Sequence, residues 1–231
     1  MPKILYKGHR MLTEGTPEFR FEVADADKAG FSFKAGQNVD MTLSSLAYPD
    51  EGKGKMRTFS LSSPPSQAPL FTIATRMSDS AFKKTLIELP IDTQIEITNP
   101  GGQFTLPKSA EFPLVFIAGG IGITPFMSIV QDATERTLPH KIILIYSNRS
   151  EATAAYLPEL RAAAQANPNF TLIENYGPLT PELVKERTAA LSTPTYYTAG
   201  PPGMVGMVKE TLKGLGVSDD DILVEEFAGY Q

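Results

Sequence analysis

The sequence predicts a two-domain fold, an N-terminal antiparallel β-barrel followed by an α/β domain built on a parallel sheet. Two different patterns of apolar and polar residues along the 231-residue chain support this fold class. Up to about Pro107, short runs such as Phe19–Val23 alternate apolar and polar residues, as in antiparallel strands with one solvated face. Beyond that point, continuous apolar runs alternate with helical stretches, which is typical of a doubly wound parallel sheet. We therefore place the domains at residues 1–108 and 113–231.

In the first domain, Gly, Pro, Asp and Ser break the sequence into short β-like segments. Strands are expected at Leu5–Leu12, Phe19–Ala24, Asn38–Leu43, Met56–Ser62, Leu70–Arg76, Gln94–Thr98 and Gln103–Leu106. A helix is expected at Ala81–Leu89, where Phe82, Leu86 and Leu89 recur at helical spacing.

In the second domain, the runs 113–118 and 142–146 are apolar throughout, so both faces of these strands should be covered. Further strands are expected at Thr195–Ala199 and Ile222–Glu225. Helices are expected at Pro125–Glu135, Ala152–Ala166, Pro181–Arg187 and Pro202–Leu215.

Composition narrows the function classes. A net charge of −5 argues against a nucleic-acid footprint. The absence of cysteine excludes a cysteine-ligated iron–sulfur cluster in this chain, and the two histidines are far apart, so no metal site is expected. There is no signal-peptide pattern and no apolar run near the roughly 18 residues that a membrane span needs. These features predict a cytoplasmic protein without a membrane span.

Two glycine-containing turns could cradle phosphates. In Gly119–Pro125, a strand ends, glycines admit a close approach, and Thr124 and Pro125 suit the cap and first position of a helix. A helix N-terminus attracts phosphate, although the segment is not the G-x-G-x-x-G motif. The turn Gly200–Met204 also lies between a strand and a helix. The alternative for each is an ordinary turn between a strand and a helix.

Two segments of the first domain could hold a flat, phosphorylated ligand. Arg57–Ser60 offers a cation for a phosphate, an aromatic ring for a ring face and a hydroxyl for a ring nitrogen. Arg76–Ala81 precedes the expected helix, with Ser80 as a candidate N-cap. The alternatives are an edge-strand arginine beside a core phenylalanine, and simple helix capping.

In their order and spacing, these motifs resemble the ferredoxin–NADP⁺ reductase superfamily over nearly the whole chain. Arg57–Ser60 is similar to the family's Arg-x-Tyr-Ser/Thr flavin motif, and Gly119–Pro125 to its nicotinamide-nucleotide turn. Gly200–Met204 is similar to its second nucleotide loop, and Glu225-x-Phe227 to the ending in which an aromatic ring covers the flavin. Two further similarities lie at Phe33–Gln37 and Asn99–Phe104.

The resemblance implies FAD in the barrel, with FMN as the alternative, and NADPH or NADH on the α/β domain. Hydride would pass to the flavin, and electrons would pass to a separate acceptor such as ferredoxin, flavodoxin or an oxygenase component. The implied catalytic residues are Ser60, Glu225 and Phe227. The implied cofactor-binding residues are Arg57, Thr58, Phe59, Ser60, Ala74, Thr75, Arg76, Ser78, Ser80, Ala81, Gly120, Gly122, Thr124, Pro125, Asn148, Arg149, Gly200, Pro201, Met204 and Phe227.

Two departures from the family pattern leave alternatives open. Phe59 stands where tyrosine is usual, and Ala199 where cysteine commonly precedes Gly-x-x-x-Met. These departures motivate a second hypothesis, that the chain is a non-catalytic or regulatory relative. A third hypothesis is an enzyme that binds a phosphate ligand through the glycine turns alone. Arg149 favours the 2′-phosphate of NADPH, whereas Glu151 would suit the ribose hydroxyl of NADH.

Overall fold

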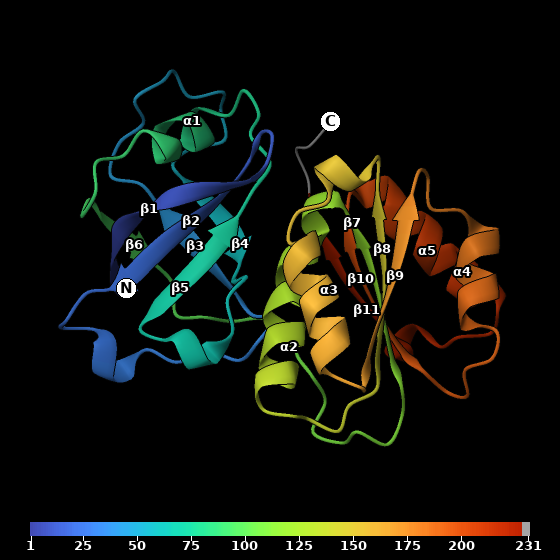
Figure 1. Cartoon of the computed structure of the whole chain (residues 1–231). Helices are drawn as coiled ribbons and strands as arrows, with labels where there is room; N and C mark the ends of the chain where they lie inside the picture. Colours follow the sequence, from blue (N-terminus) through green and yellow to red (C-terminus); the bar gives the residue numbers. More distant parts are fainter. Residues whose placement is uncertain (228–231) are drawn as a thin grey trace.

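The computed structural model describes residues 1–227, which form a barrel-like antiparallel sheet and a parallel sheet side by side (Figure 1). The predicted fold class is confirmed. Within the described residues, no helix combines the length and apolarity that crossing a membrane requires.

The first sheet has six antiparallel strands in the order β4-β3-β6-β1-β2-β5. They are β1 (Lys3–Thr13), β2 (Thr16–Val23), β3 (Asn38–Thr42), β4 (Met56–Ser60), β5 (Leu70–Ala74) and β6 (Gln94–Ile97). Their inward side chains, including Phe19, Phe21 and Phe71, form one buried core. The strand predicted at Gln103–Leu106 is wrong: only an isolated bridge joins Gly101 to Asn38, and Phe104 packs instead on Phe126 and Tyr197 of the other domain.

The second sheet has five parallel strands in the order β11-β10-β7-β8-β9. They are β7 (Leu114–Gly119), β8 (Ile142–Asn148), β9 (Phe170–Tyr176), β10 (Thr195–Gly200) and β11 (Ile222–Glu226). From β7, the chain first adds β8 and β9 on one side and then β10 and β11 on the other. The strand order therefore reverses next to β7. Open α/β sheets bind ligands at the carboxyl ends of strands at such a switch point.

Helices cover both faces of the parallel sheet (Figure 1). Because side chains alternate along a strand, Leu114, Phe116 and Ala118 pack in the core that includes α2 (Ile123–Glu135) and α3 (Leu157–Ala166). Val115 and Ile117 pack in the core that includes α4 (Pro181–Thr188) and α5 (Pro202–Gly214). A short helix, α1 (Ala81–Ile87), closes one end of the barrel.

Two helix predictions need correction. The stretch Ala152–Ala166 is interrupted: a 3₁₀ turn at Glu151–Thr153 is separated from α3 by Tyr156, whose φ of 61° is left-handed. The other helix begins at Ile123 rather than Pro125, because a 3₁₀ turn at Gly120–Gly122 leads directly into it. Thr124 therefore lies inside the first turn of α2 and is not its N-cap.

Buried polar contacts join the two domains. Ser128 of α2 donates to the carbonyl of Ser63 at 2.6 Å, and the Tyr197 hydroxyl donates to the carbonyl of Thr105 at 2.9 Å. The Tyr156 hydroxyl donates to Glu18 Oε1 of β2 at 2.9 Å. Because buried hydrogen bonds are costly to leave unmade, these contacts fix how the two sheets face each other.

Candidate functional site

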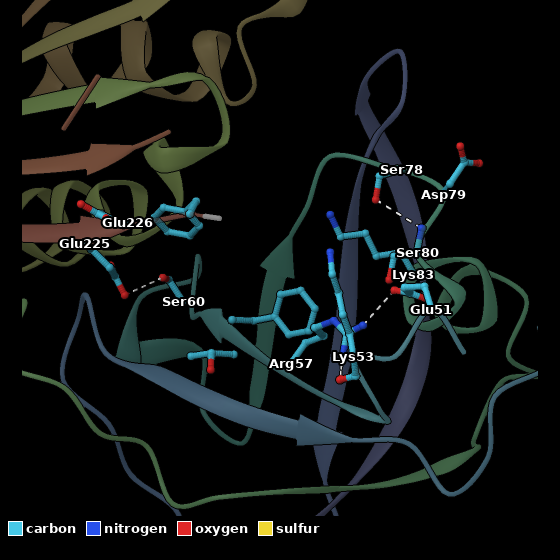
Figure 2. A pocket seen from close by; sticks show the side chains of 13 residues that line it. Glu51, Lys53, Arg57, Ser60, Ser78, Asp79, Ser80, Lys83, Glu225 and Glu226 are labelled. Atoms are coloured by element: carbon cyan, nitrogen blue, oxygen red, sulfur yellow. Dashed lines mark hydrogen bonds and ion pairs between the residues drawn. The ribbon is translucent and has the colours of Figure 1, made fainter. Parts of the chain in front are cut away.

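A cavity of about 560 Å³, here called the barrel cavity, lies at the open end of β4 (Figure 2). Arg57, Thr58, Phe59 and Ser60 all line it, together with Ser78 and Ser80 from the segment before α1. The strand and the pre-helix segment, read as separate candidates in the sequence, thus meet at one site.

Arg57 is held rigidly at the barrel cavity. Its guanidinium donates to the carbonyls of Met56 and Lys53 at 2.7 and 2.8 Å and pairs with Glu51 at 3.1 Å. Its central carbon lies 5.3 Å from the ring centroid of Phe82. Phe59, which is buried, also packs on Phe82, with 5.8 Å between ring centroids. The cation and the aromatic ring are therefore fixed by contacts that do not require a ligand.

Glu51 occupies a position at which a bound anion would be stabilised. One carboxylate oxygen accepts from Arg57, and the other accepts from the backbone N–H of Ala81 at 3.0 Å. The pKa of Glu51 is lowered to about 2, chiefly by the Ala81 N–H. The carboxylate is thus ionised at neutral pH and shows that this end of the cavity favours negative charge.

Ser60 and Glu225 form the contact that joins the barrel to the last strand of the parallel sheet (Figure 2). The Ser60 hydroxyl and the Asn38 amide donate to Glu225 Oε1 at 3.3 and 3.2 Å. The other carboxylate oxygen, Oε2, is buried with no hydrogen-bond partner among the described residues. Burial raises the pKa of Glu225, and the two donors oppose the shift. This carboxyl is therefore suited to holding a proton beside Ser60.

A second cavity of about 550 Å³, here called the sheet cavity, lies at the carboxyl ends of the parallel strands. It is lined by Gly120, Asn148, Arg149, Pro201 and Met204 among others. The side-chain nitrogen and oxygen of Asn148 are both buried and have no hydrogen-bond partner among the described residues. Buried amides are normally satisfied, so this pair points to a polar ligand in the cavity.

Glycines let the two turns beside the sheet cavity approach each other closely. A Cβ on Gly122 would lie 2.2 Å from the carbonyl oxygen of Ala199, and one on Gly119 would lie 2.3 Å from the Met204 sulfur. Gly200 has a φ of +156° and would meet the Met204 methyl at 2.8 Å. Only glycine fits these positions without a shift in its neighbours. Gly122 and Gly200 thus shape the site through packing, and neither lines either cavity.

Phe227 lines both cavities. Its backbone N–H donates to the carbonyl of Gly200 at 2.9 Å, which fixes the end of β11 beside the second glycine turn. The side chain is partly buried and packs against the core of the α/β domain. The two cavities therefore adjoin at one aromatic ring.

Several residues implied by the resemblance lie elsewhere. Arg76 lines the sheet cavity, not the barrel cavity that contains Arg57. Besides Gly122 and Gly200, five others line neither cavity, and all are buried: Ala74, Thr75, Ala81, Thr124 and Pro125. The Thr124 hydroxyl donates back to the carbonyl of Ile121 at 3.2 Å, so it serves the local turn. Ala81 contributes its backbone N–H, which Glu51 already binds.

Sequence reasoning missed five charged residues at the barrel cavity: Glu51, Lys53 and Lys83, together with Asp79 and Glu226. Glu51 and Lys53 belong to a polar segment that resembles a solvated loop, and Lys83 resembles a polar residue on a helix surface. Their convergence on Arg57 depends on how the loop and α1 fold over β4. Only the adjacency of Lys53 to the motif could have suggested it.

The fold and the site define a class of protein: a barrel domain and a nucleotide-type α/β domain with two adjoining cavities. Residues 116–210 match the family model for the oxidoreductase NAD-binding domain. The chain is 28% identical to ferredoxin–NADP reductase B of Sorangium cellulosum, covering 94% of both proteins. It is 26% identical to a flavohemoprotein of Rhizobium meliloti over 90% of this chain, and it spans only 56% of that relative's length.

A cytochrome P450 reductase from Amycolatopsis has the same fold, with a TM-score of 0.81 at 21% identity, over 98% of this chain and 69% of that one. In sequence the chain is thus similar to ferredoxin–NADP reductases and ferredoxin reductase components, and its residues 116–210 match an oxidoreductase NAD-binding domain.

Proposed function

We propose that this chain binds FAD in the barrel cavity and NAD(P)H in the sheet cavity, and passes electrons to a separate acceptor protein. The observation that carries the proposal is that Phe227 lines both cavities, so two ligands could meet at its ring. FAD, when bound, supplies the chemistry, because it accepts a hydride from reduced nicotinamide and can release electrons singly or in pairs.

The residues present fit both groups. For FAD, Arg57 offers a positive charge to the phosphates, and Phe59 offers an aromatic face to the ring system. The Glu51 carboxylate, which accepts from Arg57, is an anion that the barrel cavity already stabilises. Toward the nucleotide, the buried Asn148 amide supplies unused polar atoms, and Gly120 adds no side chain to the wall of the cavity. The sheet cavity therefore offers polar atoms that the chain itself does not satisfy, and the barrel cavity offers a cation that contacts within the chain already hold in place.

Three residues have roles at the junction of the cavities. Phe227 would occupy the junction of the cavities and would have to move aside for two ligands to meet there. Glu225, with its raised pKa, would hold a proton; once protonated, its carboxyl would donate to the Ser60 oxygen, and the Ser60 hydroxyl would turn away from Glu225 to donate its own proton onward. The Asn38 amide would keep the Glu225 carboxyl oriented toward Ser60.

We further infer that NADPH is preferred over NADH. Arg149 lines the sheet cavity, and a guanidinium there suits a 2′-phosphate. Glu151, the nearby acid that could bind a ribose hydroxyl, instead pairs with Arg161 at 2.6 Å. Arg161 also pairs with Glu174 at 2.7 Å, so a network holds the acid away from this role.

The acceptor is proposed from the relatives. One relative is named a ferredoxin–NADP reductase, and another is the ferredoxin reductase component of a 3-ketosteroid 9α-monooxygenase. A ferredoxin, a flavodoxin or an oxygenase component is accordingly the class of acceptor we propose.

The test is an anaerobic titration of FAD-loaded protein with NADPH and NADH, followed by a screen of acceptors. We expect the flavin absorbance to bleach, with NADPH effective at lower concentration. The non-catalytic alternative, motivated by Phe59 and Ala199, predicts that both ligands bind and that the absorbance does not change. Failure to bind any flavin would refute the proposal as a whole.

A further inference from the structure

Positive charge gathers at one end of the barrel cavity. Lys53, Arg57 and Lys83 line it, and Figure 2 shows the side chains of Lys53 and Lys83 reaching into the cavity from the loop before β4 and from α1. Lys83 is unusual among the three because its residue is only 7% exposed. Lysine is almost never buried to this extent without a reason, since its charge loses water.

Lys83 is positioned by the helix that carries it. Its neighbours Phe82 and Leu86 are fully buried in the barrel core, which fixes the orientation of α1. The Lys83 ammonium donates to the carbonyl of Arg76 at 2.8 Å, which holds it at the cavity wall. The next residue, Lys84, faces outward and pairs with Asp79 at 3.1 Å. Two adjacent lysines thus have opposite environments.

The charges around Lys83 oppose its own. Burial, followed by the nearby Arg57, Lys53 and Arg76, lowers the pKa of Lys83 to about 8. The acids that line the same cavity are Glu51, Asp79, Glu225 and Glu226. Glu51 is held by Arg57 and the Ala81 N–H, Asp79 by Lys84, and Glu225 by Ser60 and Asn38, while Glu226 is exposed at the end of β11. The cluster of cations is therefore suited to a ligand that brings more than one negative charge.

We propose that Lys83 is a binding residue for the diphosphate of the dinucleotide flavin, acting with Arg57 across the barrel cavity. The inference rests on the proposed function, because it assumes that FAD occupies this cavity. A diphosphate carries about two negative charges, and an ammonium beside it forms a charge-assisted hydrogen bond. Bound phosphate would also favour the protonated lysine, so FAD binding above pH 8 should take up a proton.

The experiment compares Lys83→Met, Lys83→Arg and the matched control Lys84→Met. The FAD dissociation constant of apo-protein is measured by quenching of flavin fluorescence between pH 6.5 and about 9. Proton uptake is measured by calorimetry in buffers of different ionisation enthalpy. We expect Lys83→Met to weaken FAD binding about ten- to a hundredfold, the range for a charge-assisted hydrogen bond. Lys84→Met should bind FAD as the wild type does.

The pH profile separates a binding role from a structural one. Wild-type affinity should fall as the pH rises through about 8, because the lysine must then be protonated on binding. Lys83→Arg should bind FAD with a flat profile and no proton uptake, because arginine stays charged. This arm decides the matter even if Lys83→Met does not fold.

Three outcomes would overturn the inference: wild-type FAD affinity in Lys83→Met, equal losses in Lys83→Met and Lys84→Met, or the wild-type pH dependence in Lys83→Arg. If wild-type protein binds no FAD at all, the proposed function fails first. If it binds FAD with no dependence on Lys83, only this inference fails.

Discussion

Gly122→Ala tests how closely the two glycine turns must approach. A Cβ at this position would lie 2.2 Å from the carbonyl oxygen of Ala199, 2.5 Å from its carbonyl carbon and 2.7 Å from the Gly200 Cα. All three are backbone atoms and cannot rotate away. The backbone of Gly122 is ordinary for an L-residue, with φ of −60°, so the effect is one of contact and not of strain in φ.

The magnitude follows from this geometry. Relieving a contact of 2.2 Å to an ordinary 3.4 Å requires the turn and the end of β10 to separate by about 1 Å. Overpacking of this kind costs about 1–3 kcal/mol. For a protein of this size, each kcal/mol corresponds to about 2–4 °C in Tm, so we expect Tm to fall by about 2–12 °C.

The assay is thermal unfolding together with titration of FAD and NADP⁺. Affinity for NADP⁺ should fall, because the sheet cavity lies beside this turn, whereas affinity for FAD should be retained. Gly206→Ala is the matched control: its Cβ would meet nothing within 4 Å, and alanine in the interior of α5 should raise stability by about 0.5–1 kcal/mol. Equal effects of the two substitutions on Tm and NADP⁺ affinity would refute the reasoning.

Three further predictions concern the junction and the loop. Phe227→Ser should tighten NADP⁺ binding about five- to thirtyfold, because no ring must be displaced, and an unchanged dissociation constant would contradict this. In the wild type, the free energy of unfolding should fall as the pH rises above 4.5 and through the raised pKa of Glu225. Denaturant titrations of Glu225→Gln should lack that component, and an identical pH profile would count against a buried acid. Glu51→Gln should strengthen FAD binding, by up to about fivefold, because the carboxylate no longer competes for Arg57. Weaker FAD binding in this variant would assign Glu51 a role in supporting the ligand.

The sequence was sufficient for the fold class because its two periodicities are strong. The run 113–118 is apolar throughout and became the central strand β7, buried along its whole length. By contrast, β9 was not predicted, because it is an edge strand whose residues are mostly half-exposed. The predicted strand at Gln103–Leu106 failed for the opposite reason: Phe104 and Leu106 are apolar because they pack on the second domain.

Parts of the candidate site could likewise be predicted from the sequence, and other parts could not. The contact between Ser60 and Glu225 joins residues 165 positions apart; the resemblance named both as site residues, but the contact itself was not predicted. No local pattern distinguishes Lys83 from Lys84, although Lys83 is buried at the cavity and Lys84 is half-buried and pairs with Asp79. Thr124 had the right residue type for a cap, but a preceding 3₁₀ turn moved the start of the helix. Tertiary packing decided each of these outcomes.

Stopped-flow reduction under anaerobic conditions tests the central claim most directly, since it asks whether two ligands meet at Phe227. FAD-loaded protein mixed with NADPH should lose its visible flavin absorbance in a single turnover, at a rate that saturates with NADPH concentration. Protein that binds both ligands but keeps its flavin oxidised would contradict the account, because adjoining cavities would then not bring the two rings together.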